Sequence, residues 1–234
     1  MNIIVLLAGR SSRFKKYYNT PKHLIDIKKK TMIRAAVESI KIKATYIFVV
    51  LENKFIRETV KEINKLKVKK RIFKIKNITR GPAESAYFVT KTLNLNSELM
   101  IINCDQIMNW NPVYFLNHVR KFDGGVVTYY EQTKANSYAL VSENLLVKKI
   151  KEKKVISNIS LNGIHYWKKN KFFNESFIKM KSKNEKINNE YYIAPTYNYM
   201  IKNNLKVTIY HIPNEQHNSV GSYVDLKKYL KKSK

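Results

Sequence analysis

The chain has 234 residues, of which 45 are Lys or Arg and 17 are Asp or Glu, so its formal net charge is +28 at pH 7. This length suits one α/β domain with a substantial apolar core. The single cysteine, Cys104, excludes an internal disulfide framework, and the five histidines show no metal-ligand spacing with it. No apolar run approaches the ~20 residues of a membrane span. We expect a cytoplasmic protein without a membrane partner.

The positive charge is spread along almost every segment, together with abundant Asn, Ile and Tyr. This is the pattern expected when an AT-rich genome biases codon choice. We interpret it as a solvated basic surface rather than a dedicated nucleic-acid face, since no zinc-finger or RNA-binding signature accompanies it. A basic field would still attract phosphorylated substrates.

In the first half of the chain, short apolar runs alternate with segments of helical period. Runs rich in β-branched and aromatic residues predict strands at 2–8, 45–52, 71–77 and 99–105. Helices are predicted at 54–67, which carries an apolar stripe, and at 81–93, where Pro82 falls in the first turn. This alternation predicts a mostly parallel sheet with helices on both faces.

After Asp105 the pattern changes to short alternating strands, predicted at 124–132, 137–143, 144–153 and 159–167. A helical segment at 189–201, a strand at 205–213 and a charged helix from about Ser222 are predicted to follow. No linker, repeat or low-complexity tract separates the halves, so we expect a single domain over residues 1–234.

Three short segments at one edge of the predicted sheet carry residues suited to binding phosphate groups, either directly or through a metal ion. The stretch "LLAGRSSRF" (6–14) follows the first strand, and its main-chain N–H groups with the Arg13 guanidinium could hold a phosphate. Lys22 follows Pro21, whose fixed φ stiffens the segment. Asp105 ends the fourth strand at the same edge, where a carboxylate can hold Mg²⁺ between phosphates.

Taken in order, "LLAGRSSRF", "PKHLI", "GPAESAY", "NCDQ" and "KEKKVISNISLNGIHYW" resemble the motifs of the nucleoside-diphosphate-sugar pyrophosphorylases, which are sugar-phosphate nucleotidyltransferases. "NEYYIAPTYNYMI" and "VGSYVDLKKYL" resemble segments near the C-terminus of short, capsule-associated members. The resemblance covers nearly the whole chain. It implies a Rossmann-like glycosyltransferase A-type fold, with a mostly parallel central sheet flanked by helices and a small additional β region.

The activity implied by this resemblance is transfer of a nucleoside monophosphate from a nucleoside triphosphate to a sugar 1-phosphate, with release of pyrophosphate. Mg²⁺ would be the cofactor, and the product would serve as a precursor of surface glycans. The nucleotide-binding part would be about residues 1–110, and the acceptor-binding part about residues 111–234.

The resemblance also implies roles for individual residues. The catalytic residues would be Arg13 and Lys22, which neutralise the triphosphate, and Asp105, which holds the metal. The nucleotide-binding residues would be Ala8, Gly9, Arg10, Ser11, Ser12, Asn77 and Gly81. The acceptor-binding residues would be Glu152, Lys153, Gly163 and Glu190, with Lys153 on the acceptor phosphate. We interpret the tyrosines of residues 189–200 as core and helix packing.

Two positions depart from the family pattern. Ser11 stands where a glycine is usual, so the phosphate loop must tolerate a Cβ there. The family's second metal aspartate would fall at about Ser219. The nearest carboxylate is Asp225, which we keep as a second metal candidate. Ser222 and Asp225 also match a capping pair at a helix start, and we favour that role.

No general base is expected for this chemistry. A phosphate monoester is already mostly dianionic at neutral pH, because its second pKa is about 6. Positioning and charge neutralisation would then supply most of the catalysis. Three alternatives remain open: a cytidylyltransferase for a non-sugar phosphate such as phosphocholine, a glycosyltransferase of similar fold, and a degenerate scaffold that binds nucleic acid.

Overall fold

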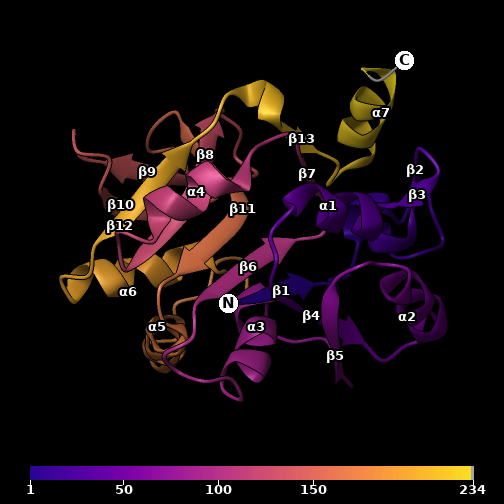
Figure 1. Cartoon of the computed structure of the whole chain (residues 1–234), viewed down its shortest axis with the longest axis horizontal. Coiled ribbons are helices and arrows are strands. Elements are labelled where there is room, and N and C mark those ends of the chain that lie inside the picture. Colours follow the sequence, from indigo (N-terminus) through magenta and orange to yellow (C-terminus); the bar gives the residue numbers. More distant parts are fainter. Residues whose placement is uncertain (233–234) are drawn as a thin grey trace.

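A nine-stranded sheet runs through the computed structural model, which describes residues 1–232 (Figure 1). The strand order is β10-β9-β11-β6-β1-β4-β5, and β8 pairs with β11 and β12. Its strands are β1 (Asn2–Leu6), β4 (Thr45–Leu51), β5 (Lys69–Ile75), β6 (Leu99–Asn103), β8 (Gly124–Tyr130), β9 (Ser137–Val141), β10 (Val147–Glu152), β11 (Ile159–Trp167) and β12 (Val207–His211). Two short pairs lie outside this sheet: β2 (Asp26–Ile27) with β3 (Lys30–Thr31), and β7 (Gln106–Met108) with β13 (His217–Ser219).

The four strands of the first half are parallel, because β1 pairs with both β4 and β6, and β4 pairs with β5. From β1 the chain moves outward through β4 to β5, then returns to β6 on the other side of β1. Parallel sheets bind ligands at the carboxyl ends of the strands, where the strand order reverses in this way. The predicted α/β fold with its parallel central strands is confirmed.

The second half is joined to this sheet through β11, which runs antiparallel to β6, β8 and β9. Every strand predicted in the second half is present, although each is shorter than or equal to its predicted range. Both halves of the chain therefore contribute to one continuous sheet.

Helices cover both faces of the sheet. On one face lie α3 (Pro82–Thr90), α5 (Asn170–Ser182) and α6 (Tyr197–Lys202), and on the other lie α1 (Met32–Ile40), α2 (Ile56–Asn64) and α4 (Pro112–Val119). The sequence patterns predict α2, α3 and α6 but not α1, α4 or α5. These three helices form because each buries side chains against the sheet, as Phe173 and Phe177 of α5 do.

The predicted helix at 189–201 is wrong in its first half, since α6 begins only at Tyr197, after a 3-10 turn at Ala194–Thr196. Tyr191 instead makes backbone hydrogen bonds to the segment before α3. Its N–H donates to the carbonyl of Arg80 at 2.7 Å, and its carbonyl accepts from the N–H of Ala83 at 3.0 Å. These bonds hold the segment extended and out of the helix.

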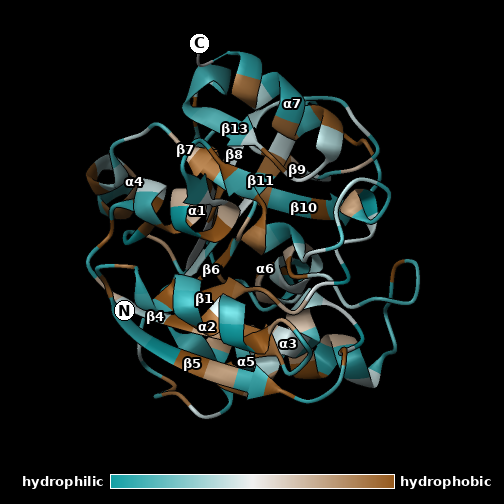
Figure 2. Ribbon diagram, turned by 90° about the vertical axis from the view of Figure 1, so that its right-hand side faces the viewer, coloured by the Kyte–Doolittle hydropathy of each residue, from teal (hydrophilic) through white to brown (hydrophobic). Residues whose placement is uncertain are grey.

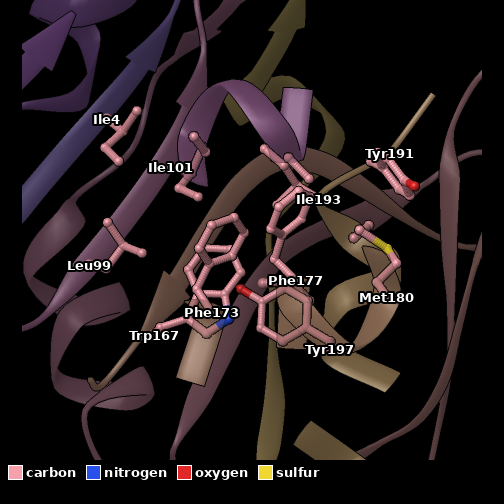
Figure 3. Close-up of a cluster of buried hydrophobic side chains, with 14 of the residues drawn as sticks. Ile4, Leu99, Ile101, Trp167, Phe173, Phe177, Met180, Tyr191, Ile193 and Tyr197 are labelled. Carbon is pink, nitrogen blue, oxygen red and sulfur yellow. The ribbon is translucent and has the colours of Figure 1, made fainter. Parts of the chain in front are cut away.

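Figure 3 shows the aromatic core beneath α5 and α6. The Trp167 and Tyr197 rings stack with centroids 4.7 Å apart, and Phe173 meets Trp167 edge-on at 5.0 Å. Phe177 packs against Tyr87 and Tyr191, so this core reaches the segment that contacts α3. Aromatic side chains bury much apolar area, and such clusters dominate core stability.

The last helix, α7 (Tyr223–Lys231), packs on segments from the start of the chain. In Figure 1 it lies beside the indigo β2, β3 and α1, and in Figure 2 its ribbon alternates teal and brown, as expected for a helix with one apolar face. Leu226 joins a cluster with Phe14 and Ile25, and the Tyr223 ring stacks on Tyr17 at 3.7 Å. None of the helices within residues 1–232 has the length and apolar character to cross a membrane.

We expect Phe177→Ala to lower the free energy of unfolding by roughly 3–5 kcal/mol, because it removes a fully buried ring and leaves a cavity. Urea unfolding followed by circular dichroism would measure this. Ile178→Ala is the matched control, since Ile178 is the next residue of α5 and is 50% exposed. Equal losses in the two variants would contradict the assignment of Phe177 to the core.

Candidate functional site

A cavity of about 580 Å³ opens at the carboxyl ends of β1 and β6, where the strand order reverses. Its walls come from the segment after β1, the start of α3, the end of β6, the strands β10 and β11, and the segment before α6. Twelve of the predicted site residues line it: Ala8, Gly9, Arg10, Ser12, Arg13, Lys22, Gly81, Asp105, Glu152, Lys153, Gly163 and Glu190. Ser11, Asn77 and Asp225 do not.

The loop after β1 turns sharply at Ser11, which has a left-handed backbone with φ 52° and ψ 29°. This conformation favours glycine, the residue usual here in the family, and costs a residue with a Cβ roughly 1–2 kcal/mol. The Ser11 hydroxyl accepts a hydrogen bond from the N–H of Lys22 at 3.0 Å. Ser11 therefore lies outside the cavity but ties the loop to the lysine. At Gly9, by contrast, a Cβ would meet nothing within 4 Å.

Lys22 and Asp105 form an ion pair at the cavity wall, with Nζ 2.6 Å from Oδ2. The side chains are 21% and 5% exposed, and the Arg13 guanidinium lies 4.0 Å from the same oxygen. Burial acts to raise the pKa of Asp105, but the Lys22 ammonium and Arg13 hold it below its usual range. Burial likewise acts to lower the pKa of Lys22, and Asp105 raises it overall. Both groups are therefore charged at neutral pH.

The lysine is anchored by the residue that follows it. The buried His23 ring shares a hydrogen bond of 2.9 Å with the Thr59 hydroxyl of α2. Burial lowers the pKa of His23 to about 4, so this ring is neutral. The 3-10 turn Lys22–Leu24 is thus fixed to the body of the protein beside the cavity.

The C-terminal segment fixes Asp105 from the other side. The N–H of Val220 donates to the carbonyl of Asp105 at 2.9 Å, and Ser219 pairs with Gln106 between β13 and β7. A Cβ at Gly221 would lie 2.7 Å from Asp105 Oδ2, so the chain passes this carboxylate at a distance that only glycine allows. Ser219 lines the cavity at the position where the family pattern has an acid.

One carboxylate oxygen of Asp105 is available to a cation. Oδ1 is buried and has no hydrogen-bond partner among the described residues, while Oδ2 is taken by Lys22. An unpaired buried oxygen is costly, and a hard cation such as Mg²⁺ prefers oxygen ligands. Residues 1–232 contain no group of three or more His, Cys, Asp or Glu side chains that could hold a metal by themselves. Asp105 therefore fits a cation that takes its other ligands from a substrate.

Asp225 lies at the start of α7, outside the cavity wall. Its N–H donates to the Ser222 hydroxyl at 3.1 Å, and that hydroxyl donates to Asp225 Oδ2 at 2.6 Å. These contacts place the pair in the helix cap that the sequence favours.

On the opposite wall, Glu152 and Lys153 both face the cavity although they are consecutive residues. Successive side chains of a strand point to opposite faces, but β10 ends at Glu152 and Lys153 has a left-handed backbone with φ 53°. The Ser137 hydroxyl donates to Glu152, and burial raises the pKa of that carboxyl. The Lys153 ammonium donates to the Tyr192 hydroxyl, which in turn donates to Glu190 Oε2 at 2.6 Å.

Gly81 is the residue before α3 and has a φ of 120°. A Cβ there would lie 2.5 Å from the backbone nitrogen of Tyr191, so the glycine allows the segment before α6 to approach α3. Ile78, Thr79 and Pro82 line the cavity beside it. Asn77 is exposed and is not brought into this wall.

The sequence analysis assigns no site role to several residues that line the cavity, among them Asn103, Gln106, Asn136, Ser137, Asn162, His165, Tyr192 and Gly221. The interpretation of the tyrosines as packing holds for the buried Tyr191 but is wrong for Tyr192. The sequence signal that could have identified Tyr192 as a site residue was its position two residues after Glu190, in the same motif. The others depend on the antiparallel pairing of β11 with β6, of β9 with β10 and of β13 with β7, which the sequence does not reveal.

Comparisons with known proteins address the family and the fold. A model of the MobA-like NTP transferase domain matches residues 3–154, whereas a search of curated proteins found no match. The fold is similar to that of a nucleoside-diphosphate-sugar pyrophosphorylase from Vibrio cholerae, with a TM-score of 0.88 and 22% identity over 99% of this chain and 100% of that one.

Two further solved structures share the fold. One is an inositol-1-phosphate CTP transferase from T. maritima, with a TM-score of 0.78 and 17% identity over 98% of this chain and 93% of that one. The other is a CTP:phosphocholine cytidylyltransferase from Streptococcus pneumoniae, with a TM-score of 0.75 and 20% identity over 100% of this chain and 99% of that one.

The matched domain runs from β1 to just past β10, and it includes the loop after β1, the Lys22–Asp105 pair and the Glu152–Lys153 end of β10. The chain belongs to the MobA-like NTP transferase domain family and is a nucleotidyltransferase.

Proposed function

We propose that the protein transfers a nucleoside monophosphate from a nucleoside triphosphate to a phosphorylated acceptor, with release of pyrophosphate. The observation that carries this proposal is that one cavity joins a basic loop to the Glu152–Lys153 end of β10. A sugar 1-phosphate is the first candidate acceptor, and a surface glycan precursor is the corresponding product. The substrates of such a reaction are made in the cytoplasm, where we expect the protein to act.

The triphosphate would lie against the loop after β1. Main-chain N–H groups of residues 9–12 would contact it, and the side chains of Arg10, Arg13 and Lys22 line that part of the cavity. The nucleobase would lie near Gly81, beside Ile78 and Pro82. We thus keep the nucleotide-binding part at about residues 1–110 and the acceptor-binding part at about 111–234, as two sides of one domain.

Mg²⁺ would be held by Asp105 through Oδ1, and by phosphate oxygens of the substrate. When bound, it would neutralise charge that develops on the phosphates. Asp225 is not part of this proposal, because its carboxylate is engaged in the cap of α7.

The residues of this chain would act mainly by positioning and charge. Lys153 would hold the acceptor phosphate, whose dianionic oxygen attacks the α-phosphorus of the triphosphate. A new phosphorus–oxygen bond forms as the bond from the α-phosphorus to the bridging oxygen breaks, and pyrophosphate leaves with that electron pair. Arg13 and Lys22 would stabilise the charge on the departing pyrophosphate. Glu190 and Glu152 would contact the rest of the acceptor.

A cytidylyltransferase acting on phosphocholine or a related phosphate is the second candidate, because the Tyr192 ring lies in the acceptor side of the cavity. Aromatic rings bind quaternary ammonium groups. A glycosyltransferase has less support, since Asp105 is the one carboxylate among the described residues that lines the cavity on the side of the first loop, while the other two, Glu152 and Glu190, line the opposite wall. Nothing in the cavity favours nucleic acid.

The first test is pyrophosphate release. We expect release with Mg²⁺ from at least one pair formed by ATP, CTP, GTP, UTP or dTTP with a panel of sugar 1-phosphates and phosphocholine. Chelation with EDTA should abolish it. If no pair in the panel gives pyrophosphate release, and circular dichroism shows that the protein is folded, the proposed function is contradicted.

The second test is Lys22→Met. Turnover should fall at least roughly a hundredfold, the scale of losing one electrostatic stabiliser. Stability should fall too, by roughly 3–5 kcal/mol, because the variant leaves the Asp105 charge buried without its partner. The double variant Lys22→Met/Asp105→Asn should regain much of the lost free energy of unfolding, because it no longer buries an unpaired charge, but it should regain none of the activity. Lys29→Met changes an exposed lysine near the same turn and is the control. If the Lys22→Met variant shows normal turnover, Lys22 has only a structural role.

The third test separates the two aspartates. Asp105→Asn should remove activity even at saturating nucleotide. Asp225→Asn should cost about 1 kcal/mol of stability, as for a lost helix cap, and leave the Mg²⁺ dependence of the rate unchanged. Magnesium titrations and thermal melts of both variants measure this. A sharp shift of the Mg²⁺ requirement in Asp225→Asn at unchanged stability would instead make Asp225 a metal ligand.

A further inference from the structure

Two carboxylates, Glu152 and Glu190, line the acceptor side of the cavity without a salt bridge among the described residues. Within residues 1–232, neither Glu152 nor Glu190 has a Lys or Arg nitrogen within 4.0 Å, whereas Glu38, Glu62, Glu84, Glu98 and Asp105 all do. Their hydrogen bonds come from the neutral hydroxyls of Ser137 and Tyr192. Both carboxylates are half-buried in the cavity wall, where a negative charge without a close cation is costly.

The Tyr192 ring between them already holds a cation. The Lys153 ammonium lies 4.4 Å from its centroid, within the range of a cation–π contact. The same ammonium donates to the Tyr192 hydroxyl, whose own proton goes to Glu190. The chain's own lysine thus shows that this wall accepts a positive charge.

The proposed reaction would draw that lysine away, because Lys153 is the group expected on the acceptor phosphate. The Tyr192 ring would then be free, and Glu152 and Glu190 would lose the ammonium of Lys153 as a neighbour. Burial raises the pKa of Glu152, so its charge is already costly where it lies. A carboxylate or second phosphate on the acceptor would be repelled, and a neutral group would leave the wall's negative charge unbalanced.

The lining beside this wall suits a compact organic cation. Leu161, Ile193 and Ala194 supply apolar surface next to Tyr192. His165 also lines the cavity, and burial lowers its pKa to about 3, so its ring is neutral and adds no repelling charge.

We propose that the acceptor carries a positively charged amine at the end remote from its phosphate, and that Glu152, Glu190 and the Tyr192 ring bind this amine. The inference rests on the proposed nucleotidyl transfer and narrows its acceptor class. Both an amino sugar phosphate and the phosphate of an amino alcohol have this chemistry.

The test compares acceptors in matched pairs by kcat/KM for pyrophosphate release. 6-Amino-6-deoxyglucose 1-phosphate against glucose 1-phosphate tests a primary amine on the far side of a sugar from its phosphate, and phosphocholine against 3,3-dimethylbutyl phosphate tests a quaternary ammonium group. We expect the charged member of at least one pair to be favoured by about tenfold or more, the scale of a partly desolvated cation–π contact. The pair in which the charged acceptor is preferred shows whether the amine belongs to a sugar or to an amino alcohol.

The variants Glu190→Gln, Glu152→Gln and Tyr192→Leu should each move this charged-to-neutral ratio toward one. Glu143→Gln is the control, since Glu143 is exposed on the surface and should leave the ratio unchanged. Neutral acceptors used equally well or better by the unmodified enzyme would overturn the inference and leave nucleotidyl transfer standing. Absence of pyrophosphate release with any acceptor would overturn both.

Discussion

The ion pair between Lys22 and Asp105 is the contact on which the site depends. It joins the turn after the first loop to the end of β6, 83 positions later in the chain, at the point where the strand order reverses. A carboxylate that is only 5% exposed is stable as an anion only with a cation beside it. Ser11 and His23 hold the lysine, while Val220 and Gly221 confine the aspartate. Four separate segments therefore share one electrostatic anchor.

The arrangement of charge across the cavity follows from this anchor. Arg10, Arg13 and Lys22 against Asp105 leave the loop side with excess positive charge, and Glu152 and Glu190 against Lys153 leave the opposite side negative. The whole chain is strongly basic, so the negative wall is a local exception to its composition. A substrate with a highly charged phosphate end and a differently charged far end would have only one favourable orientation in this field.

Much of the fold could be predicted from the sequence, because its apolar runs are buried on both faces of the sheet and its motifs occur in family order. The strands of both halves and the pairing of Ser222 with Asp225 are local signals. What the sequence could not supply depends on pairing between distant segments. Tyr192 enters the cavity because Tyr191 makes backbone hydrogen bonds to Arg80 and Ala83 at the start of α3, which lie more than 100 positions earlier in the chain. The left-handed turn at Ser11 is indicated only by the resemblance, in which glycine is usual at this position, because serine by itself does not favour that conformation.

The packing of α7 on Phe14 and Ile25 has a consequence for how the protein is made. The first loop precedes most of the sheet in the chain, but β13 and α7, which cover it and confine Asp105, are synthesised only after all nine strands of the main sheet. A nascent chain that already contains these nine strands still lacks Val220 and Gly221, which confine its aspartate. Because contacts between distant segments form slowly, the order of synthesis and the order of assembly differ here. Competence to bind a nucleotide would therefore follow only once β13 and α7 have been made and have packed against the first loop.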